Sequence, residues 1–168
     1  MREELAKELG VSLKYLNNRS QVLNYTNEDM NLKLDNDEQV YIAVFDIPIE
    51  SGIVGFQTQS LALVFVLNTH LYHGSGSLVT DLERRPEVMK AMQSVLISCH
   101  QAVEYLERVE DYSFYNSSNV RVYLKTQKGV FFRELGKNNG RVDNFLTSMM
   151  NYVMKSISES GGIEGNIR

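Results

Sequence analysis

Apolar positions recur with two different spacings along the chain, and each spacing predicts a different element. In residues 86–109 they fall three or four positions apart, the period of an amphipathic helix. They are Val88, Met92, Val95, Leu96, Cys99, Ala102, Val103 and Leu106. Residues 141–158 show the same spacing, with Val142, Phe145, Leu146, Met149, Val153 and Ile157. Pro86 suits a first helical position, and Thr80 with Glu83 has capping-box spacing for a short turn before it. Two long helices are expected.

Other segments alternate or are apolar throughout, which is typical of strands. Residues 120–135 alternate on both sides of a Lys-Gly turn and predict a hairpin. Residues 61–67 are almost continuously apolar, as in a strand covered on both faces, and Asn68-Thr69 predicts a turn into a return strand through Tyr72. A further hairpin is expected from Leu32 and Leu34 to a strand in residues 40–49, which Pro48 and the following Ser-Gly would end.

The first sixteen residues carry Leu5, Ala6, Leu9, Leu13 and Leu16 at helical spacing, interrupted by Gly10. The order helix, strands, long helix, hairpin, helix predicts an α+β fold. Its antiparallel sheet of five to six strands would pack with two long helices and a short N-terminal one. This order is loosely similar to that of profilin-like and roadblock-like domains. We expect an N-terminal part with the first strand (1–38), a main domain (39–160) and a flexible tail (161–168).

Composition narrows the class of protein. The net charge of the 168 residues is −4, and no dense cluster of Lys and Arg is present, so broad affinity for nucleic acid is not expected. A single cysteine excludes an internal disulfide and suits a reducing compartment. No basic start leads into an apolar segment, and residues 61–67 are too short to span a bilayer. A cytoplasmic protein without membrane contact is expected.

Residues 2–21 resemble the helix-turn-helix of lambda-repressor-like domains. Gly10 stands at the turn and Ser12 would cap the second helix, which would direct Lys14, Asn17, Asn18 and Arg19 to a DNA groove. Arg19, however, occupies a position where the pattern has an apolar residue, and the following polar segment predicts no further helix. We therefore expect an N-terminal helix that docks on the sheet, and a DNA-binding regulator is the alternative.

Residues that could bind metal or catalyse a reaction are few. His70 and His73 lie three apart, so on a strand they point to opposite faces. His100 neighbours Cys99 on a helix, where the two point in different directions. Ser75 and Ser77 lack the strand-turn-helix setting of a nucleophile. No metal, cofactor or catalytic residue is predicted, and an enzyme with a site near the 73–77 loop is the third hypothesis.

Two loops remain as candidate binding surfaces. Tyr112, Phe114 and Tyr115 fall in a predicted loop, where exposed aromatics would suit an interface, unless they fold back over the protein. His73, Ser75 and Ser77 lie in the other loop. Asp46, in an otherwise apolar run, is expected to end its strand and bond the next turn. We therefore predict a non-enzymatic binding protein that self-associates as a homodimer through apolar strand edges and binds a protein or small ligand.

Overall fold

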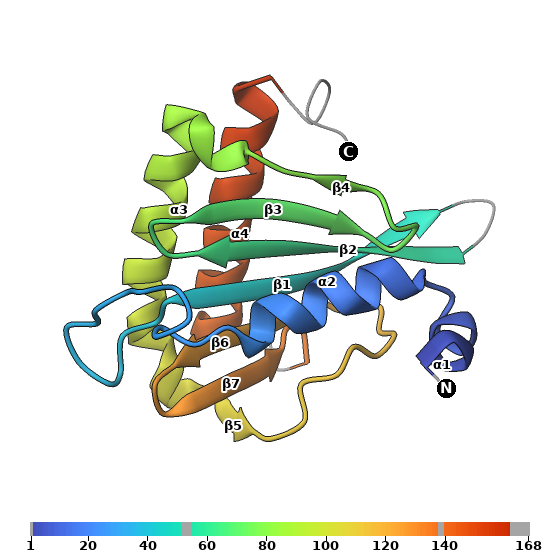
Figure 1. Ribbon diagram of the computed structural model, residues 1–168, viewed down its shortest axis with the longest axis horizontal. Helices are drawn as coiled ribbons and strands as arrows, with labels where there is room; N and C mark the ends of the chain where they lie inside the picture. Colours follow the sequence, from blue (N-terminus) through green and yellow to red (C-terminus); the bar gives the residue numbers. More distant parts are fainter. Residues whose placement is uncertain (1, 52–54, 138–139, 162–168) are drawn as a thin grey trace.

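The strands form an antiparallel sheet in the order β4-β3-β2-β1-β6-β7-β5, with helices on both faces (Figure 1). The computed structural model describes residues 2–51, 55–137 and 140–161. Its strands are β1 (Ile42–Ser51), β2 (Gly55–Val64), β3 (Asn68–His73), β4 (Leu78–Val79), β5 (Glu107–Val109), β6 (Arg121–Thr126) and β7 (Gly129–Glu134). Its helices are α1 (Arg2–Leu9), α2 (Leu13–Asn24), α3 (Pro86–Cys99) and α4 (Arg141–Glu159), with the 3-10 turns η1 (Leu82–Arg84) and η2 (His100–Tyr105). The predicted α+β class is confirmed, and the described residues form seven strands instead of the expected five to six.

β1 is the central strand and is apolar on both faces because both faces are covered. Ala43 and Phe45 point into the core that α3 and α4 close. Ile42 and Val44 point the other way, into the core that α2 closes. Alternation of side chains along a strand places neighbours in different cores.

The two long helices lie side by side on one face of the sheet (Figure 1). Arg85 donates a hydrogen bond from Nη1 to the carbonyl of Ile157, 3.3 Å away. The start of α3 therefore adjoins the end of α4, and the two helices run antiparallel. On the opposite face α2 crosses the middle strands. α1 precedes it in the chain, and the turn at Gly10 joins the two helices.

Two predictions about the region around β1 are wrong. Leu32 and Leu34 form no strand, and β1 pairs instead with β2 and β6. Pro48 lies inside β1, opposite Thr58. It is tolerated there because β6 pairs with β1 only as far as Asp46, so the missing N–H of proline leaves no ladder position empty on that side.

The helix predicted for residues 86–109 ends at Cys99, and the chain continues as η2 and then as β5. β5 exists because residues Glu107–Val109 pair with Val130–Phe132 of β7, a contact that local spacing does not reveal.

The 61–72 hairpin is confirmed, but its turn comes earlier than Asn68, with Val66 at φ 68°. The short turn before α3 follows Asp81 and not Thr80. The 120–135 hairpin and the helix of residues 141–158 are confirmed. Residues 162–168 of the expected tail lie outside the described residues.

Candidate ligand-binding groove and the polar cluster beside it

A row of polar residues crosses four strands on the face that α2 covers. Ser60 of β2 is directly opposite Asp46 of β1, Asp46 is opposite Arg121 of β6, and Arg121 is opposite Glu134 of β7. Directly opposed residues of antiparallel strands share a face, so these four side chains gather on one side of the sheet. Ser60, Asp46 and Arg121 are buried.

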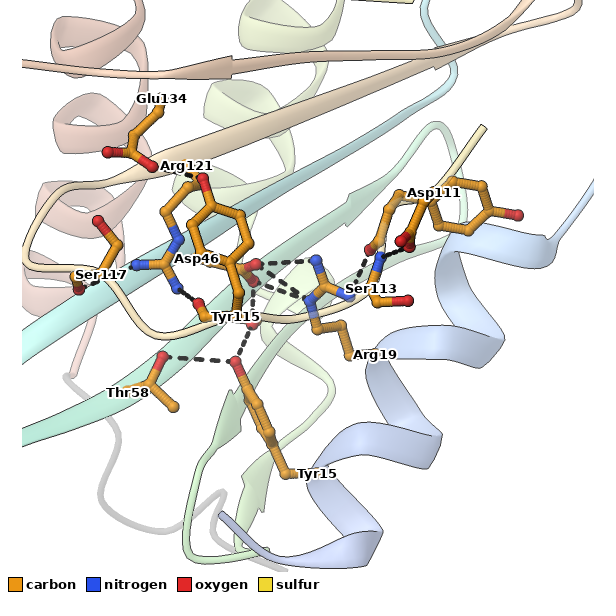
Figure 2. Close-up of polar contacts among 12 residues, drawn as sticks. Tyr15, Arg19, Asp46, Thr58, Asp111, Ser113, Tyr115, Ser117, Arg121 and Glu134 are labelled. Atoms are coloured by element: carbon orange, nitrogen blue, oxygen red, sulfur yellow. Dashed lines mark hydrogen bonds and ion pairs between the residues drawn. The ribbon is translucent and has the colours of Figure 1, made fainter. Parts of the chain in front are cut away.

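Arg19 reaches this row from α2 and points at Asp46 (Figure 2). Its Nε lies 3.1 Å from each oxygen of Asp46, and its Nη2 lies 2.9 Å from Oδ2. The exposed fractions of the two side chains are 3% and 0%. Nη1 donates to the carbonyl of Tyr112, 2.8 Å away. This one guanidinium therefore connects α2 with β1 and with the loop of residues 111–119 between β5 and β6. The expectation that Asp46 ends its strand is wrong: it lies within β1 and balances the charge of a buried arginine.

Three hydroxyl groups continue the network from Asp46 toward the surface. Ser60 donates to Asp46 over 2.6 Å, so its own oxygen accepts from Tyr15, also at 2.6 Å. The Tyr15 hydroxyl then accepts from Thr58 at 3.5 Å. Burial, with the nearby Asp46 charge, raises the pKa of Tyr15, which therefore stays a neutral donor. Each hydroxyl in this series therefore donates to the next group, from Thr58 through Tyr15 and Ser60 to the buried carboxylate of Asp46.

Arg121 holds the loop of residues 111–119 across the sheet. Its Nη2 donates to the carbonyl of Tyr115 at 2.8 Å, and its Nη1 donates to the carbonyls of Ser117 and Asn119 at 3.2 and 2.8 Å. The guanidinium also lies 5.5 Å from the ring centre of Phe114 and 5.2 Å from that of Tyr115. A buried cation that binds three carbonyls and two rings fixes the course of the loop.

Glu134, at the end of the row, holds the same loop from outside. It accepts hydrogen bonds from the Tyr115 hydroxyl and from Asn119 Nδ2. Burial acts to raise the pKa of Glu134, but these bonds and the Lys137 charge outweigh it, so its pKa is lowered and it stays ionised.

A groove of about 850 Å³ opens beside Thr58, where the α1–α2 turn, the paired ends of β1 and β2, the turn after β3 and the 111–119 loop meet. The described residues that line it are Leu9, Gly10, Val11, Ile49, Gln57, Thr58, His73, Gly74, Ser75, Ser77, Asn116, Ser117 and Ser118. Within this set the polar groups are hydroxyls, amides and one imidazole, without a carboxylate, an ammonium or a guanidinium. Burial lowers the pKa of His73, so the imidazole is neutral near pH 7.

A backbone hydrogen bond connects the turn after β3 with the start of α2. Ser12 N donates to the carbonyl of Gly74 at 2.7 Å, and Gly74 N donates to that of Thr58 at 2.8 Å. Gly76 has φ 102°, and a Cβ there would lie 2.8 Å from Ser12 Oγ. Glycine is therefore required where the two turns pack together.

The structure brings together three of the predicted surface residues and separates the other three from them. His73, Ser75 and Ser77 line the groove. Phe114 is buried, with its ring edge-on to Tyr15 at 5.4 Å, and the Tyr112 hydroxyl donates to Asn24 at 2.5 Å. Phe114 and Tyr112 thus fold back onto the protein, whereas Tyr115 stays 36% exposed with its hydroxyl on Glu134. Asn116, Ser117 and Ser118, which the sequence did not single out, reach the groove.

The residues of the helix-turn-helix alternative do not share one surface. Ser12 caps α2 as that alternative predicts, because its Oγ accepts from Tyr15 N at 3.0 Å. Lys14 and Asn17 are exposed and Asn18 is half-buried, but Arg19 points into the sheet. The arginine that breaks the apolar pattern is therefore the one that pairs with Asp46.

The histidines and the cysteine do not gather at one site. His70 Nδ1 is 3.0 Å from the Tyr72 hydroxyl, and His73 is three residues further along β3. Cys99 is buried, and burial raises its pKa to about 12. His100 is exposed and contacts the carbonyl of Glu38, beside a second cavity of about 840 Å³. Among the described residues, no three His, Cys, Asp or Glu side chains are placed to hold a metal ion.

Comparison with known proteins adds no relationship to this picture: no family model, curated protein or solved structure matches the chain. Within the described ranges, no helix has both the length and the apolar character needed to cross a membrane.

Proposed function

We propose that the protein is a non-enzymatic binding protein whose groove takes an uncharged ligand that hydrogen-bonds through amide or hydroxyl groups. The chemistry of the lining carries this proposal. Thr58, Ser77 and Ser117 offer hydroxyls, and Asn116 with Gln57 offers amides, all of which pair with neutral donors and acceptors. A charged ligand would lose its hydration without meeting an opposite charge on the described lining.

Apolar side chains on the same groove fit the carbon part of such a ligand. Leu9 and Val11 contribute from the α1–α2 turn, and Ile49, 37% exposed, contributes from the end of β1. Mixed apolar and neutral polar lining is typical of small-molecule sites. A neutral His73 can donate at one ring nitrogen and accept at the other, which adds to the same preference.

The contacts favour binding over catalysis. Ser75 Oγ and Ser77 Oγ lie 3.3 Å apart, and a hydroxyl beside another hydroxyl is not activated as a nucleophile. No carboxylate among the described lining residues would orient His73 as a base. The burial of Arg19 likewise favours this proposal over DNA recognition by α2. The unpaired, buried Cys99 suits a reducing compartment, so we include a cytoplasmic location in the proposal.

Amide spectra of the isotope-labelled protein test the proposal with two fragment mixtures. One contains polyols and blocked dipeptides of uncharged residues, and the other contains the same fragments with a free carboxylate or ammonium group. We expect saturable shifts at residues 74–77 and 116–118 with the uncharged mixture alone. The variant Ser75→Trp, at an exposed position, should abolish the shifts because the indole fills the groove. The control Ser158→Trp on α4 should preserve them. Equal or stronger binding of the charged fragments, or no binding of either mixture, would refute the proposal.

A further inference from the structure

We infer that the ligand of the groove donates a hydrogen bond to the Thr58 hydroxyl and therefore carries an O–H or N–H group at that end. This inference rests on the proposed function, because it concerns the same groove, and it adds the direction of one contact. Alcohols and amides with an N–H group meet the requirement, whereas ketones, ethers and esters, which only accept, do not. The reason lies in the hydroxyl groups behind Thr58 (Figure 2).

Asp46 fixes the direction of this series of hydroxyls at its buried end. Its carboxylate is 0% exposed and paired with Arg19, and a carboxylate can only accept. Ser60 therefore points its proton at Asp46 Oδ1, 2.6 Å away. A hydroxyl has one proton, so on its other side Ser60 can only accept, and the proton comes from Tyr15 at 2.6 Å.

The same rule reaches the groove at Thr58. Because the Tyr15 proton is used on Ser60, the Tyr15 oxygen can only accept from Thr58, 3.5 Å away. Within the described part of the chain, Tyr15 is the one polar group that the Thr58 hydroxyl contacts. Thr58, which is 9% exposed and lines the groove, thus directs its proton inward and leaves its oxygen to accept from a ligand.

Packing keeps the Thr58 side chain in this orientation. A Cβ at Gly74 would lie 2.9 Å from Thr58 Cγ2, so the methyl group of Thr58 is packed tightly against the turn after β3. Gly74 N also donates to the carbonyl of Thr58 at 2.8 Å, which joins the two backbones. The side chain of a β-branched residue turns as one unit about χ1. Turning the hydroxyl away from Tyr15 would therefore displace the methyl group from its place beside Gly74.

The other hydroxyl groups of the groove are free to reverse. Ser75 and Ser77 contact each other at 3.3 Å, and either can be the donor, so each can present a proton or a lone pair to a ligand. The neutral His73 offers one nitrogen of each kind. Among the described lining residues, Thr58 is the one whose hydroxyl is linked through hydrogen bonds to a buried charge. It is therefore the residue that selects the direction of a contact.

Cyclohexanol and cyclohexanone test the inference, because each has the same six-membered carbon ring and one oxygen, and only the alcohol can donate. Titrations followed through the amide shifts of residues 74–77 give the two dissociation constants. We expect the alcohol to bind about two- to tenfold more tightly than the ketone, the effect of one neutral hydrogen bond. Thr58→Val keeps the shape of the side chain and removes its hydroxyl, so it should weaken the alcohol by that factor and bring the ratio of the constants close to one.

Tyr15→Phe should change the ratio through the other probe. It keeps the ring that packs against Phe114 but removes the acceptor for the Thr58 proton, so that Thr58 can donate to the ketone. The ketone should then bind more tightly by about the same factor, and the alcohol should bind as it does to the wild type. Ser77→Ala is the matched control: it removes a reversible hydroxyl from the same groove and should leave the ratio unchanged.

The outcomes separate this inference from the proposed function. Equal affinities of the two probes for the wild type, or a ratio that Thr58→Val leaves unchanged, would overturn the inference while the groove remained a binding site. Failure of both probes to bind, with binding of the uncharged mixture of polyols and dipeptides, would also overturn the inference alone. If that mixture did not bind either, the proposed function would fall together with the inference.

Discussion

Arg19 and Asp46 form an ion pair from which solvent is excluded, with 2.9 Å between Nη2 and Oδ2. The two residues come from different layers, α2 and β1, so the pair fastens the N-terminal helices to the centre of the sheet. Its remaining bonds, from Ser60 to Asp46 and from Arg19 to the carbonyl of Tyr112, extend this connection to β2 and to the 111–119 loop. The pair thus connects α2, β1, β2 and the 111–119 loop, all of which adjoin the groove.

Removal of either partner should strongly destabilise the protein. Arg19→Met leaves Asp46 as a buried carboxylate without a cation, and Asp46→Leu leaves a buried guanidinium without an anion. We expect each to lower the free energy of unfolding by about 3–5 kcal/mol. The double variant leaves no buried charge unpaired, so its loss should be smaller than the sum of the two single losses.

Denaturant unfolding of the wild type, both single variants and the double variant measures this coupling. Lys128→Met, which breaks the solvent-exposed pair with Glu38, is the control and should leave the unfolding midpoint unchanged. Additive losses from the two single variants would show that the pair does not act as a unit.

The sequence predicted the parts of the fold that depend on near neighbours. The 120–135 hairpin and α4 followed from alternation and from a helical stripe, and the structure has both. β5 could not be predicted, because its extended form depends on pairing with β7. Leu32 and Leu34 show the reverse, since they alternate like a strand but no strand pairs with them. Pairing across the sheet decides both cases, and a local pattern does not contain it.

The candidate site was predictable only in part, for the same reason. His73, Ser75 and Ser77 stood out because a Gly-Ser turn follows a strand. Asn116 and its neighbours reach the groove through the contacts of Arg121, which no spacing reveals. Arg19 and Asp46 each looked out of place alone, as charges in apolar patterns. Two such misfits of opposite sign were the signal that could have identified the buried pair.

Loss of Arg121 should release the 111–119 loop. Arg121→Met keeps a long side chain but removes the hydrogen bonds to the carbonyls of Tyr115, Ser117 and Asn119. Each bond to a charged donor contributes about 1.5–3 kcal/mol, so local opening should become at least about tenfold more frequent. Chymotrypsin, which cleaves after aromatic residues, should then cut after Phe114 or Tyr115 faster by at least that factor.

Cleavage elsewhere distinguishes loop release from global unfolding. If the loop alone opens, the first products all end at the loop, and the rest of the chain stays resistant. Arg108→Met is the matched control. Arg108 is exposed, and among the described backbone groups it bonds only the carbonyl of Lys128, in the turn between β6 and β7. Its cleavage pattern should equal that of the wild type. An unchanged rate in Arg121→Met would mean that the rings and Glu134 hold the loop without the arginine.

Gly76→Ala should loosen the contact between the turn after β3 and the N-terminal helices. The backbone at Gly76 has φ 102°, and the added methyl would lie 2.8 Å from Ser12 Oγ. The positive φ alone costs an L residue about 1 kcal/mol or more, and the clash adds to it. Ser12→Gly removes the clashing side chain and costs a few tenths of a kcal/mol as a cap. In that background Gly76→Ala should cost less, as urea unfolding of the four proteins would show; equal losses in both backgrounds would mean that Ser12 moves aside freely.

Alkaline pH should unfold the protein through its buried tyrosines. Burial raises the pKa of Tyr123 to about 12, with a further contribution from the Asp46 charge, and burial also raises the pKa of Tyr15 and Tyr72. A phenol with a higher pKa in the folded chain binds its proton more tightly there. Its stabilisation is therefore complete below the unfolded pKa of about 10 and is lost as the pH rises through about 12.

Denaturant unfolding at successive pH values, together with the absorbance of phenolate, measures this loss. The free energy of unfolding should fall above about pH 10, and Tyr123→Phe should make the fall shallower because one of the linked protons is removed. Tyr105→Phe is the control, because the Tyr105 ring is 57% exposed and its replacement should leave the profile as in the wild type. A flat stability profile across this range would contradict the prediction, because it would mean that the phenols ionise as easily in the folded protein as in the unfolded chain.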